Sequence, residues 1–444
     1  MFEKDFIFGA ATAAYQIEGA HDSDGKTSSI WDVFSHIPGK IANGDNGDVA
    51  CDHYHLYEND IALMKEIGLD SYRFSVSWPR VIPHPGHVNE KGIDFYNRLI
   101  DKLLDNGISP MLTMYHWDLP QWMYEKGGWI SREICGYFED YSELLFNKFG
   151  DRVKYWVTHN EPYCISMLGH LYGQHAPGHK NLQDAIQTAH HLLLTHGRAL
   201  NIFRQTGLKS KIGITLNLGP AYPYSETETD KLAASRYDGF ANRWFLEPLF
   251  KGQYPVDMLD YYESNHIDFS HIQDDDLKII NGETDFLGVN YYMDFNMRYD
   301  RDAFLQGSHV DMGRKKTAMG WEISPEGFID IVRQIREKYT DIPVMITENG
   351  SAFKDEIKNG EIEDTERLEY LRSHLEAVVK MNEEGLNVIA YYVWSLMDNF
   401  EWAFGYDKRF GIIGVDYDSQ KRIIKKSGRY YSNIIKKRSL QAIE

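Results

Sequence analysis

Residues 343–350 read Pro-Val-Met-Ile-Thr-Glu-Asn-Gly. The apolar run 343–347, with Val344 and Ile346, is typical of a strand that is buried on both faces. Glu348 follows where that strand should end, and the next two residues, Asn-Gly, are a turn signal. An ionised carboxylate on a buried strand is costly unless partners compensate it. This stretch alone leaves two readings: a structural arginine or backbone amides hold Glu348, or Glu348 is directed into a cleft.

Apolar runs of this kind recur along the chain, with amphipathic helical stretches between them. The eight predicted strands span residues 7–14, 71–77, 109–115, 153–158, 211–217, 285–290, 343–347 and 387–394. Between the second and third, Ile93, Tyr96 and Ile100 share one helical face, and Asn106-Gly107 ends the helix. Alternating strands and helices predict parallel strands with crossover helices, and eight such units favour a closed (β/α)8 barrel of the α/β class.

The sequence predicts a single domain. The sequence has no low-complexity segment and no linker rich in Pro, Gly or Ser. Barrels of this class often form one domain at lengths that would otherwise suggest two or three. We therefore expect one domain over residues 1–444, with an enlarged loop region around residues 218–284.

The charge balance restricts the ligands that the chain could bind. Lysine and arginine number 47 and aspartate and glutamate 66, which gives a net charge of −19. This charge argues against nucleic acid, anionic membranes and polyphosphates as partners. Aromatic residues make up 14% of the chain, and their rings suit the apolar faces of sugars. The composition thus favours a neutral or cationic small-molecule ligand, and a homo-oligomer stays open.

The cysteines and the N-terminus predict a cytoplasmic location. Three cysteines, Cys51, Cys135 and Cys164, are too few for a disulfide framework and fit a reducing compartment. The apolar run near the N-terminus follows Glu3 and Asp5, so the basic region of a signal peptide is missing. No stretch approaches the ~20 apolar residues of a membrane span.

In a barrel of this kind the active site lies at the C-terminal ends of the strands. Polar or aromatic residues that suit sugars occur at all eight ends. They are Tyr15-Gln16, Arg73, His116-Trp117-Asp118, His159-Asn160-Glu161, Asn217, Asn290-Tyr291-Tyr292, Glu348, and Trp394 with Glu401-Trp402. Two carboxylates, Glu161 and Glu348, follow the fourth and seventh strands. Glycoside hydrolysis requires such a pair, one protonated and one ionised.

Several motifs in fixed order carry a family resemblance. They are Ala14-Tyr15-Gln16-Ile17-Glu18-Gly19, Tyr72-Arg73-Phe74-Ser75, Tyr115-His116-Trp117-Asp118-Leu119-Pro120, Asn160-Glu161-Pro162, Asn290-Tyr291-Tyr292, Ile346-Thr347-Glu348-Asn349-Gly350 and Trp394-Ser395-Leu396-Met397-Asp398-Asn399-Phe400-Glu401-Trp402. With them the chain resembles the bacterial β-glucosidases of glycoside hydrolase family 1 over residues 6–431. The resemblance implies a retaining, exo-acting β-glucosidase that needs no cofactor and no metal. Its substrates would be cellobiose, short cello-oligosaccharides and aryl β-glucosides, with galactosidase or fucosidase side activity left open.

The resemblance also implies roles for individual residues. Glu348 would be the nucleophile and Glu161 the general acid/base. Arg73, Asn160 and Tyr292 would support them, with Arg73 and Tyr292 favouring the ionised form of Glu348. The residues implied for sugar binding are Gln16, His116, Trp117, Asn290, Trp394, Glu401, Trp402 and Phe410. Tyr163 and Trp321 would line the leaving-group side, where the family often has tryptophan at the position of Tyr163.

Other functions fit the residues less well. A 6-phospho-β-glucosidase needs cationic groups near Glu401, and a carboxylate there would repel phosphate. A catalytically silent sugar-binding barrel would usually lack one of the two glutamates. A Schiff-base aldolase needs a lysine at a strand end, and none is found. The spacing of Cys51, His53 and His55 matches no standard zinc pattern.

Overall fold

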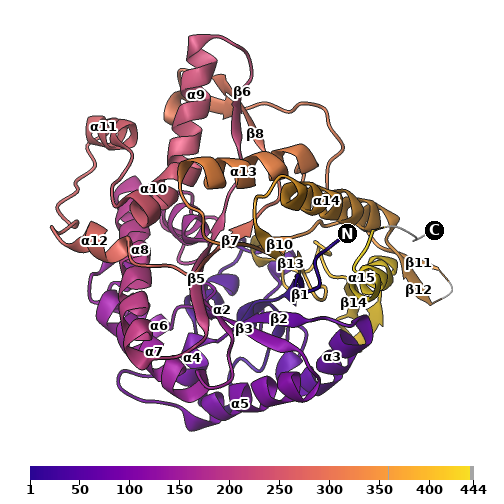
Figure 1. Ribbon diagram of the computed structural model, residues 1–444. Coiled ribbons are helices and arrows are strands. Elements are labelled where there is room, and N and C mark those ends of the chain that lie inside the picture. The colour runs from indigo at the N-terminus through magenta and orange to yellow at the C-terminus, as the bar shows by residue number, and fades with distance from the viewer. Residues whose placement is uncertain (359, 441–444) are drawn as a thin grey trace.

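The structure is a computed structural model that describes residues 1–358 and 360–440. Eight parallel strands close into a barrel in the order β1-β13-β10-β7-β5-β4-β3-β2, which confirms the predicted (β/α)8 architecture (Figure 1). The barrel strands are β1 (Ile7–Ala11), β2 (Ser71–Ser75), β3 (Ser109–Tyr115), β4 (Tyr155–Asn160), β5 (Lys211–Asn217), β7 (Phe286–Asn290), β10 (Val344–Asn349) and β13 (Val388–Trp394). Nearly all residues of these strands are buried, as expected for a sheet covered on both faces.

Helices surround the barrel and bury one face each against it (Figure 1). On α5 the buried residues include Ile93, Tyr96 and Ile100, which confirms the predicted helical face. The main helices of the ring are α3 (His53–Ile67), α5 (Glu90–Asp105), α7 (Ile134–Phe149), α8 (Leu182–Thr206), α13 (Pro325–Lys338), α14 (Thr365–Glu383) and α15 (Lys426–Lys437). Shorter helices are α1 (Ala14–Ile17), α2 (Ile30–Ser35), α4 (Trp78–Val81) and α6 (Gln121–Glu125).

The strand boundaries differ from the predicted ones at the end of the barrel that matters for function. β1 stops at Ala11, and α1 carries Gln16. β4 continues to Asn160 and β10 to Asn349, so Glu348 lies within its strand rather than after it. The register of β4 shifts between Val157 and Asn160, and that of β10 shifts after Ile346. Such irregularities re-aim side chains, and both strands contain one just before a glutamate.

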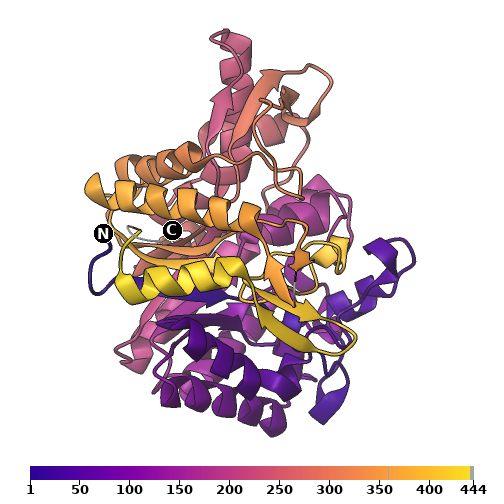
Figure 2. The same ribbon diagram turned by 90° about the vertical axis from the view of Figure 1, so that its right-hand side faces the viewer.

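A small extension stands on one side of the barrel (Figures 1 and 2). After β5 the chain forms β6 (Ala221–Pro223), α9 (Glu228–Asp238), α10 (Trp244–Lys251), α11 (Val256–Ser264) and α12 (Asp276–Ile280). After β7 it adds β8 (Phe295–Tyr299) and β9 (Gly307–His309), which join β6 in a three-stranded sheet. Ala233, Ala234 and Met297 form a minor apolar cluster that holds α9 on this sheet.

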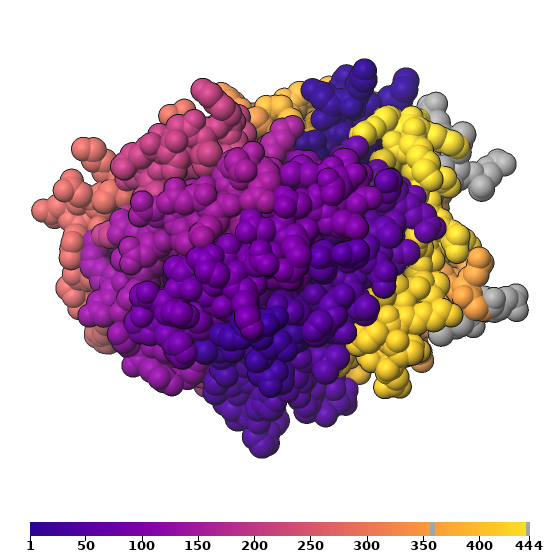
Figure 3. All heavy atoms as spheres, turned by 90° about the horizontal axis from the view of Figure 1, so that it is seen from below, coloured from indigo at the N-terminus to yellow at the C-terminus, as the bar shows by residue number. Residues whose placement is uncertain are grey.

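The two ends of the described chain meet beside β1. The backbone N–H of Phe2 donates to the carbonyl of Arg438 at 3.0 Å, and Figure 3 shows the N-terminal residues next to the C-terminal segment. Two hairpins complete the fold: β11 (Glu356–Lys358) with β12 (Glu361–Glu363), and β14 (Ile413–Asp416) with β15 (Lys421–Ile424). Within residues 1–358 and 360–440, none of the helices has the length and apolar character that crossing a bilayer requires.

Gly350 is needed for a close approach between two strand ends. A Cβ at this position would overlap the backbone carbonyl oxygen of Trp394. We expect Gly350→Ala to destabilise the fold by about 1–3 kcal/mol, the usual cost of overpacking, and to lower the midpoint of thermal unfolding. The control is Gly136→Ala in α7, where an added Cβ meets nothing within 4 Å. That substitution should be neutral or stabilising. An unchanged melting midpoint for Gly350→Ala would contradict this packing argument.

Candidate active site

A cavity of about 410 Å³ opens at the C-terminal ends of the barrel strands. Most of the predicted site residues line it: His116, Trp117, Asn160, Glu161, Tyr163, Asn290, Tyr292, Trp321, Glu348, Trp394, Glu401, Trp402 and Phe410. The other two, Arg73 and Gln16, are fully buried and contact residues of this set or of its loops. Residues from strand ends that are far apart in the sequence, from Gln16 to Phe410, thus line or support one cavity.

Glu348 is a buried carboxylate with two strong partners. Arg73 Nη1 donates to its Oε1 at 2.7 Å, and the Tyr292 hydroxyl donates to its Oε2 at 2.7 Å. Burial raises the pKa of Glu348, while the charge of Arg73 and the hydrogen bond from Tyr292 act in the opposite direction. The structure places Arg73 and Tyr292 against Glu348, as the sequence predicts, and both contacts favour its ionised form.

Glu161 has a different environment. It follows β4 directly in a left-handed conformation, with φ of 52°, and Asn290 Nδ2 donates to its Oε1 at 2.7 Å. Burial, followed by the negative charge of Glu348, raises the pKa of Glu161 to about 7. The two carboxyls therefore share one cavity but differ in their partners: Arg73 and Tyr292 counteract the rise in the pKa of Glu348, whereas the charge of Glu348 adds to the rise in that of Glu161.

Asn160 connects the residues on both sides of this pair. Its Oδ1 accepts from Arg73 Nη2 at 2.6 Å and from Asn290 Nδ2 at 3.1 Å. Its Nδ2 lies 3.0 Å from His116 Nε2. Because the amide nitrogen can only donate, His116 accepts at Nε2 and carries its proton on Nδ1. Burial, with the nearby charge of Arg73, lowers the pKa of His116 well below its usual value, so the ring is neutral.

Three polar atoms in this part of the site lack a protein partner among the described residues: Gln16 Oε1, His116 Nδ1 and Glu401 Oε2. Gln16 is oriented through its Nε2, which donates to Asn399 Oδ1 at 3.0 Å and to the Phe400 carbonyl at 2.8 Å. Burial raises the pKa of Glu401 to about 8, and the charges of Glu348 and Glu161 contribute. Buried polar atoms normally have partners, so these three are available to a ligand.

Aromatic rings enclose the same space. The rings of Trp394 and His116 lie 6.0 Å apart and nearly parallel, and Trp402 takes a similar position on His116. Trp117 packs 4.4 Å from Trp402, and its Nε1 donates to the Asn160 carbonyl at 2.8 Å. Unpaired polar atoms between indole faces suit a ligand with hydroxyl groups on an apolar ring.

The comparison with known proteins agrees with this geometry. The sequence model of glycosyl hydrolase family 1 matches residues 1–440. The chain belongs to glycosyl hydrolase family 1. It is 50% identical over 440 residues to β-glucosidase A of Acetivibrio thermocellus, with 98% of each chain covered. It is 48% identical to the 1,4-β-D-glucan glucohydrolase of Thermotoga neapolitana, with 99% of each covered. The solved structure of the family 1 β-glucosidase from Thermotoga maritima matches with a TM-score of 0.97, at 47% identity and 99% coverage of both chains.

The outer part of the cavity in this family 1 chain contains residues that the sequence reasoning missed. They are Cys164, Leu168, Gln174, His175, Leu218, Gly219, Tyr237, Ala241, Asn242, Phe295, Met319 and Phe404. Most come from the segment after β4 and from the extension, where no strand end marks them. Tyr163 and Trp321, which the sequence does indicate, belong to this outer part. The ring of Tyr163 lies 5.4 Å from Phe240, and that of Trp321 lies 5.1 Å from Tyr292.

The residues that suggested a metal site each have another partner. Cys51 Sγ donates to the Asp398 carbonyl at 3.1 Å, and His53 Nδ1 lies 2.7 Å from Asp60. His55 Nδ1 lies 2.5 Å from Asp52. In the described part of the chain, no group of three or more His, Cys, Asp or Glu side chains is arranged to hold a metal ion.

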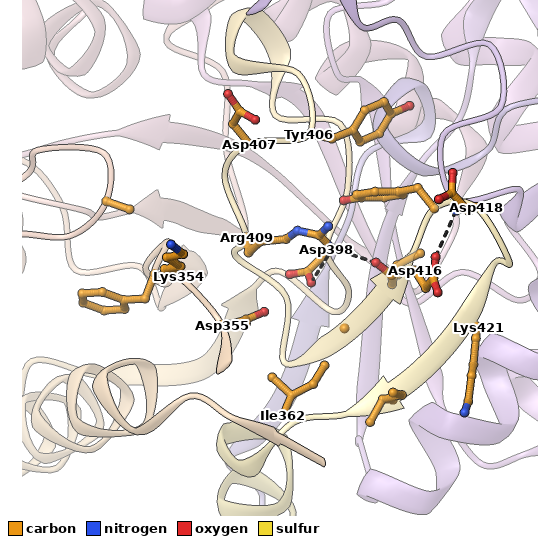
Figure 4. A pocket seen from close by; sticks show the side chains of 16 residues that line it. Lys354, Asp355, Ile362, Asp398, Tyr406, Asp407, Arg409, Asp416, Asp418 and Lys421 are labelled. Carbon is orange, nitrogen blue, oxygen red and sulfur yellow. Dashed lines mark hydrogen bonds and ion pairs between the residues drawn. The ribbon is translucent and has the colours of Figure 1, made fainter. Parts of the chain in front are cut away.

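A second hollow, of about 840 Å³, lies beside the β14–β15 hairpin and is lined in part by Asp398, Tyr406 and Arg409 (Figure 4). Two of its carboxylates, Asp355 and Asp398, are paired with Lys425, which is fully buried. Asp398 accepts from Arg409 at 3.2 Å, from Lys425 at 2.7 Å and from the backbone N–H of Gly411 at 2.9 Å. Lys425 also lies 2.6 Å from Asp355. This network fixes both ends of the loop from Asp398 to Gly411, which contains Glu401.

Replacing the central cation of this network should be costly. Lys425→Met would leave the buried carboxylates of Asp398 and Asp355 without their shared partner. Breaking a buried ion pair on one side typically costs about 3–5 kcal/mol, so the free energy of unfolding in urea should fall by a comparable amount. The matched control is Lys421→Met, because Lys421 lines the same hollow but is exposed and forms no ion pair within residues 1–358 and 360–440. Equal stability of the two variants would contradict the proposed anchoring.

Proposed function

We propose that this chain is a retaining, exo-acting β-glucosidase. It hydrolyses terminal non-reducing β-D-glucosyl residues of cellobiose, short cello-oligosaccharides and aryl β-glucosides. The observation that carries this proposal is the pair of buried carboxyls in one cavity: Arg73 and Tyr292 bind Glu348, while Glu161 has a pKa of about 7. Membership of glycosyl hydrolase family 1, and the glucosidase names of its relatives, support it.

The first step forms a covalent glycosyl-enzyme. Glu348, ionised beside Arg73, attacks the anomeric carbon and forms an ester bond as the bond to the leaving oxygen breaks. Glu161 donates its proton to that oxygen, so the leaving group departs as a neutral alcohol. Asn160 binds the sugar 2-hydroxyl in this proposal, and Gln16, His116 and Glu401 bind the other hydroxyls through the atoms that lack protein partners.

The second step hydrolyses the ester. Once Glu348 is esterified its charge is gone, and the charge that raised the pKa of Glu161 no longer acts. Glu161, now a carboxylate, takes a proton from water as the water oxygen attacks the anomeric carbon and Glu348 leaves. Two inversions at one carbon give net retention of the β configuration.

The surroundings of Glu401 disfavour the alternative of a 6-phospho-β-glucosidase. The described residues that line the cavity include no lysine and no arginine, so a sugar 6-phosphate beside the buried carboxyl of Glu401 would lack a cationic partner. The presence of both glutamates, each with specific partners, disfavours a catalytically silent barrel. Gln16 and Glu401 can bond either epimer at the sugar 4-position, so side activity on β-galactosides or β-fucosides is part of the proposal.

The proposal extends to the context of the enzyme. We assign it to the cytoplasm and to the breakdown of sugars derived from cellulose, with residues 1–444 acting as one glycosidase domain. All three cysteines are free and buried, which suits a reducing compartment. The net charge of −19 suits neutral sugars rather than nucleic acid or anionic membranes. Cell fractionation with an antibody against the chain tests the location.

Azide rescue tests the function and the assignment of the two glutamates together. Wild-type enzyme should hydrolyse 4-nitrophenyl β-glucoside and release β-glucose first, as observed by proton NMR. Glu348→Gly should lose at least about 10⁴-fold in kcat, because removal of a catalytic nucleophile leaves little of the acceleration. Azide should restore part of the activity by entering the vacated space, and the product should be the α-glucosyl azide.

The matched variant is Glu161→Gly, for which azide should give the β-glucosyl azide. Azide then attacks the covalent glycosyl-enzyme, which still forms in this variant when the substrate has a good leaving group. A β-azide from Glu348→Gly would reverse the two roles. Absence of hydrolysis by the wild type would overturn the enzyme assignment itself.

The pH profile of kcat/KM should report the two carboxyls. Activity requires Glu161 protonated, so it should fall as the pH rises through about 7. Activity also requires Glu348 ionised, so it should fall again on the acidic side. Tyr292→Phe removes a hydrogen bond that lowers the pKa of Glu348, and should move the acidic limb to higher pH. The alkaline limb should not move, because Glu348 is ionised there in both enzymes. A shift of the acidic limb to lower pH would contradict this account.

A further inference from the structure

Glu401 lacks the side-chain contacts that hold its neighbour Trp402. The Oε2 atom of Glu401 is buried and forms no hydrogen bond to any residue that the structure describes. The ring of Trp402, in contrast, packs 4.5 Å from that of Trp31 and 4.4 Å from that of Trp117. Ring contacts therefore fix Trp402, whereas the position of the Glu401 carboxyl depends on the course of its backbone.

That backbone forms a tight turn that ends at Gly405. The N–H of Glu401 donates to the carbonyl of Gly405 at 2.7 Å, and the N–H of Phe404 donates to the carbonyl of Glu401 at 2.9 Å. Gly405 has φ of 58° and ψ of −131°, a conformation that glycine adopts far more readily than other residues. The two ends of the turn are bonded to each other, so a displacement of Gly405 moves Glu401 with it.

Asp45, which lies in the long connection between β1 and α3, holds the end of this turn. Its Oδ2 accepts from the backbone N–H of Tyr406, the residue after the turn, at 3.0 Å. The approach is close, because a Cβ on Gly405 would lie 2.2 Å from the same oxygen. The Tyr406 hydroxyl also donates to the carbonyl of Asn46 at 2.7 Å. Of these contacts, that of Asp45 is the one that holds the backbone beside Gly405.

We propose that Asp45 is a positioning residue for substrate binding, which sets where the Glu401 carboxyl lies in the catalytic cavity. Asp45 does not line that cavity, so it acts on a sugar only through the turn. The inference rests on the proposed function, in which Glu401 binds sugar hydroxyls. A displaced turn would leave the two catalytic glutamates in place, because Arg73, Tyr292 and Asn290 bond them. The connection after β1 thus determines the geometry of a group that follows β13.

A double-mutant cycle tests whether Asp45 acts through Glu401. Asp45→Ala should lower kcat/KM for 4-nitrophenyl β-glucoside about three- to thirtyfold, because the Glu401 carboxyl would no longer be held at hydrogen-bond distance from the sugar. Glu401→Ala should lower it further. Asp45→Ala introduced into Glu401→Ala should then change kcat/KM less than about twofold, because the group that Asp45 positions is gone. Asp45→Asn keeps an acceptor for the Tyr406 N–H and should retain at least about half of the wild-type value.

The control is Asp407→Ala on the same loop. Asp407 is exposed and does not line the catalytic cavity, and its carboxyl accepts from Asn43 Nδ2 at 3.1 Å. This substitution also removes a bond between the two segments, yet it should change kcat/KM less than about twofold. Thermal unfolding of every variant shows whether it is folded at the assay temperature. If Asp45→Ala is not, Asp45→Ser, whose side chain is too short to reach the Tyr406 N–H, takes its place in the cycle.

A loss in the double variant that equals the product of the two single losses would overturn the inference, because Asp45 would then act independently of Glu401. An Asp45→Ala variant as active as the wild type, or an equal loss in Asp407→Ala, would overturn it as well. A wild-type enzyme that does not cleave the substrate would overturn the proposed function, and the role of Asp45 with it. That outcome is distinct from the others, in which the wild type is active.

Discussion

The burial of Arg73 is the constraint on which the site depends. This guanidinium on β2 has no solvent exposure, and a buried charge is tolerated only when its donors are satisfied and its charge is compensated. Its bonds reach Thr113 on β3, Asn160 on β4, and Thr347 and Glu348 on β10. Four strands of the barrel are thus tied to one cation inside the catalytic end. Any displacement of these strand ends would leave part of that charge unpaired.

The different surroundings of the two glutamates follow from this arrangement. Glu348 receives the full charge of Arg73, whereas the nearest bonded partner of Glu161 is the neutral amide of Asn290. Asn290 is itself oriented by Thr347, whose hydroxyl donates to its Oδ1 at 2.7 Å, so the strand of the nucleophile also positions the partner of the acid. Two carboxyls buried in one cavity thus have different electrostatic surroundings, because a single cation bonds only one of them, and this difference supports the two roles proposed above.

The fold could be predicted from the sequence because buried parallel strands leave long apolar runs, and all eight runs became barrel strands. The ends of those strands could not be placed as well. The prediction ended the strand before Glu348, since a carboxylate is unfavourable in a buried strand. In the structure Arg73 removes that penalty, so β10 continues to Asn349. The strand-end rule and the family motifs together located the inner site, from Gln16 to Trp402. They could not locate Tyr237, Gln174 or Phe295, because contacts between the extension and the barrel leave no periodic signal in the chain.

The inner part of the cavity was easier to predict than the outer part because different elements form the two parts. The inner part is made by barrel strands, where Arg73 connects Asn160 and Glu348, and by the loop anchored through Asp398. The outer part is made by α9, β8 and the segment after β4, which are held by a minor apolar cluster and by ring contacts. Among the described residues, the ring contacts of Tyr163 are with Phe240 and Phe245 in the extension, not with the residues that bond Arg73. The chemistry of the glutamates and the choice of leaving group are therefore set by parts of the structure that can change independently.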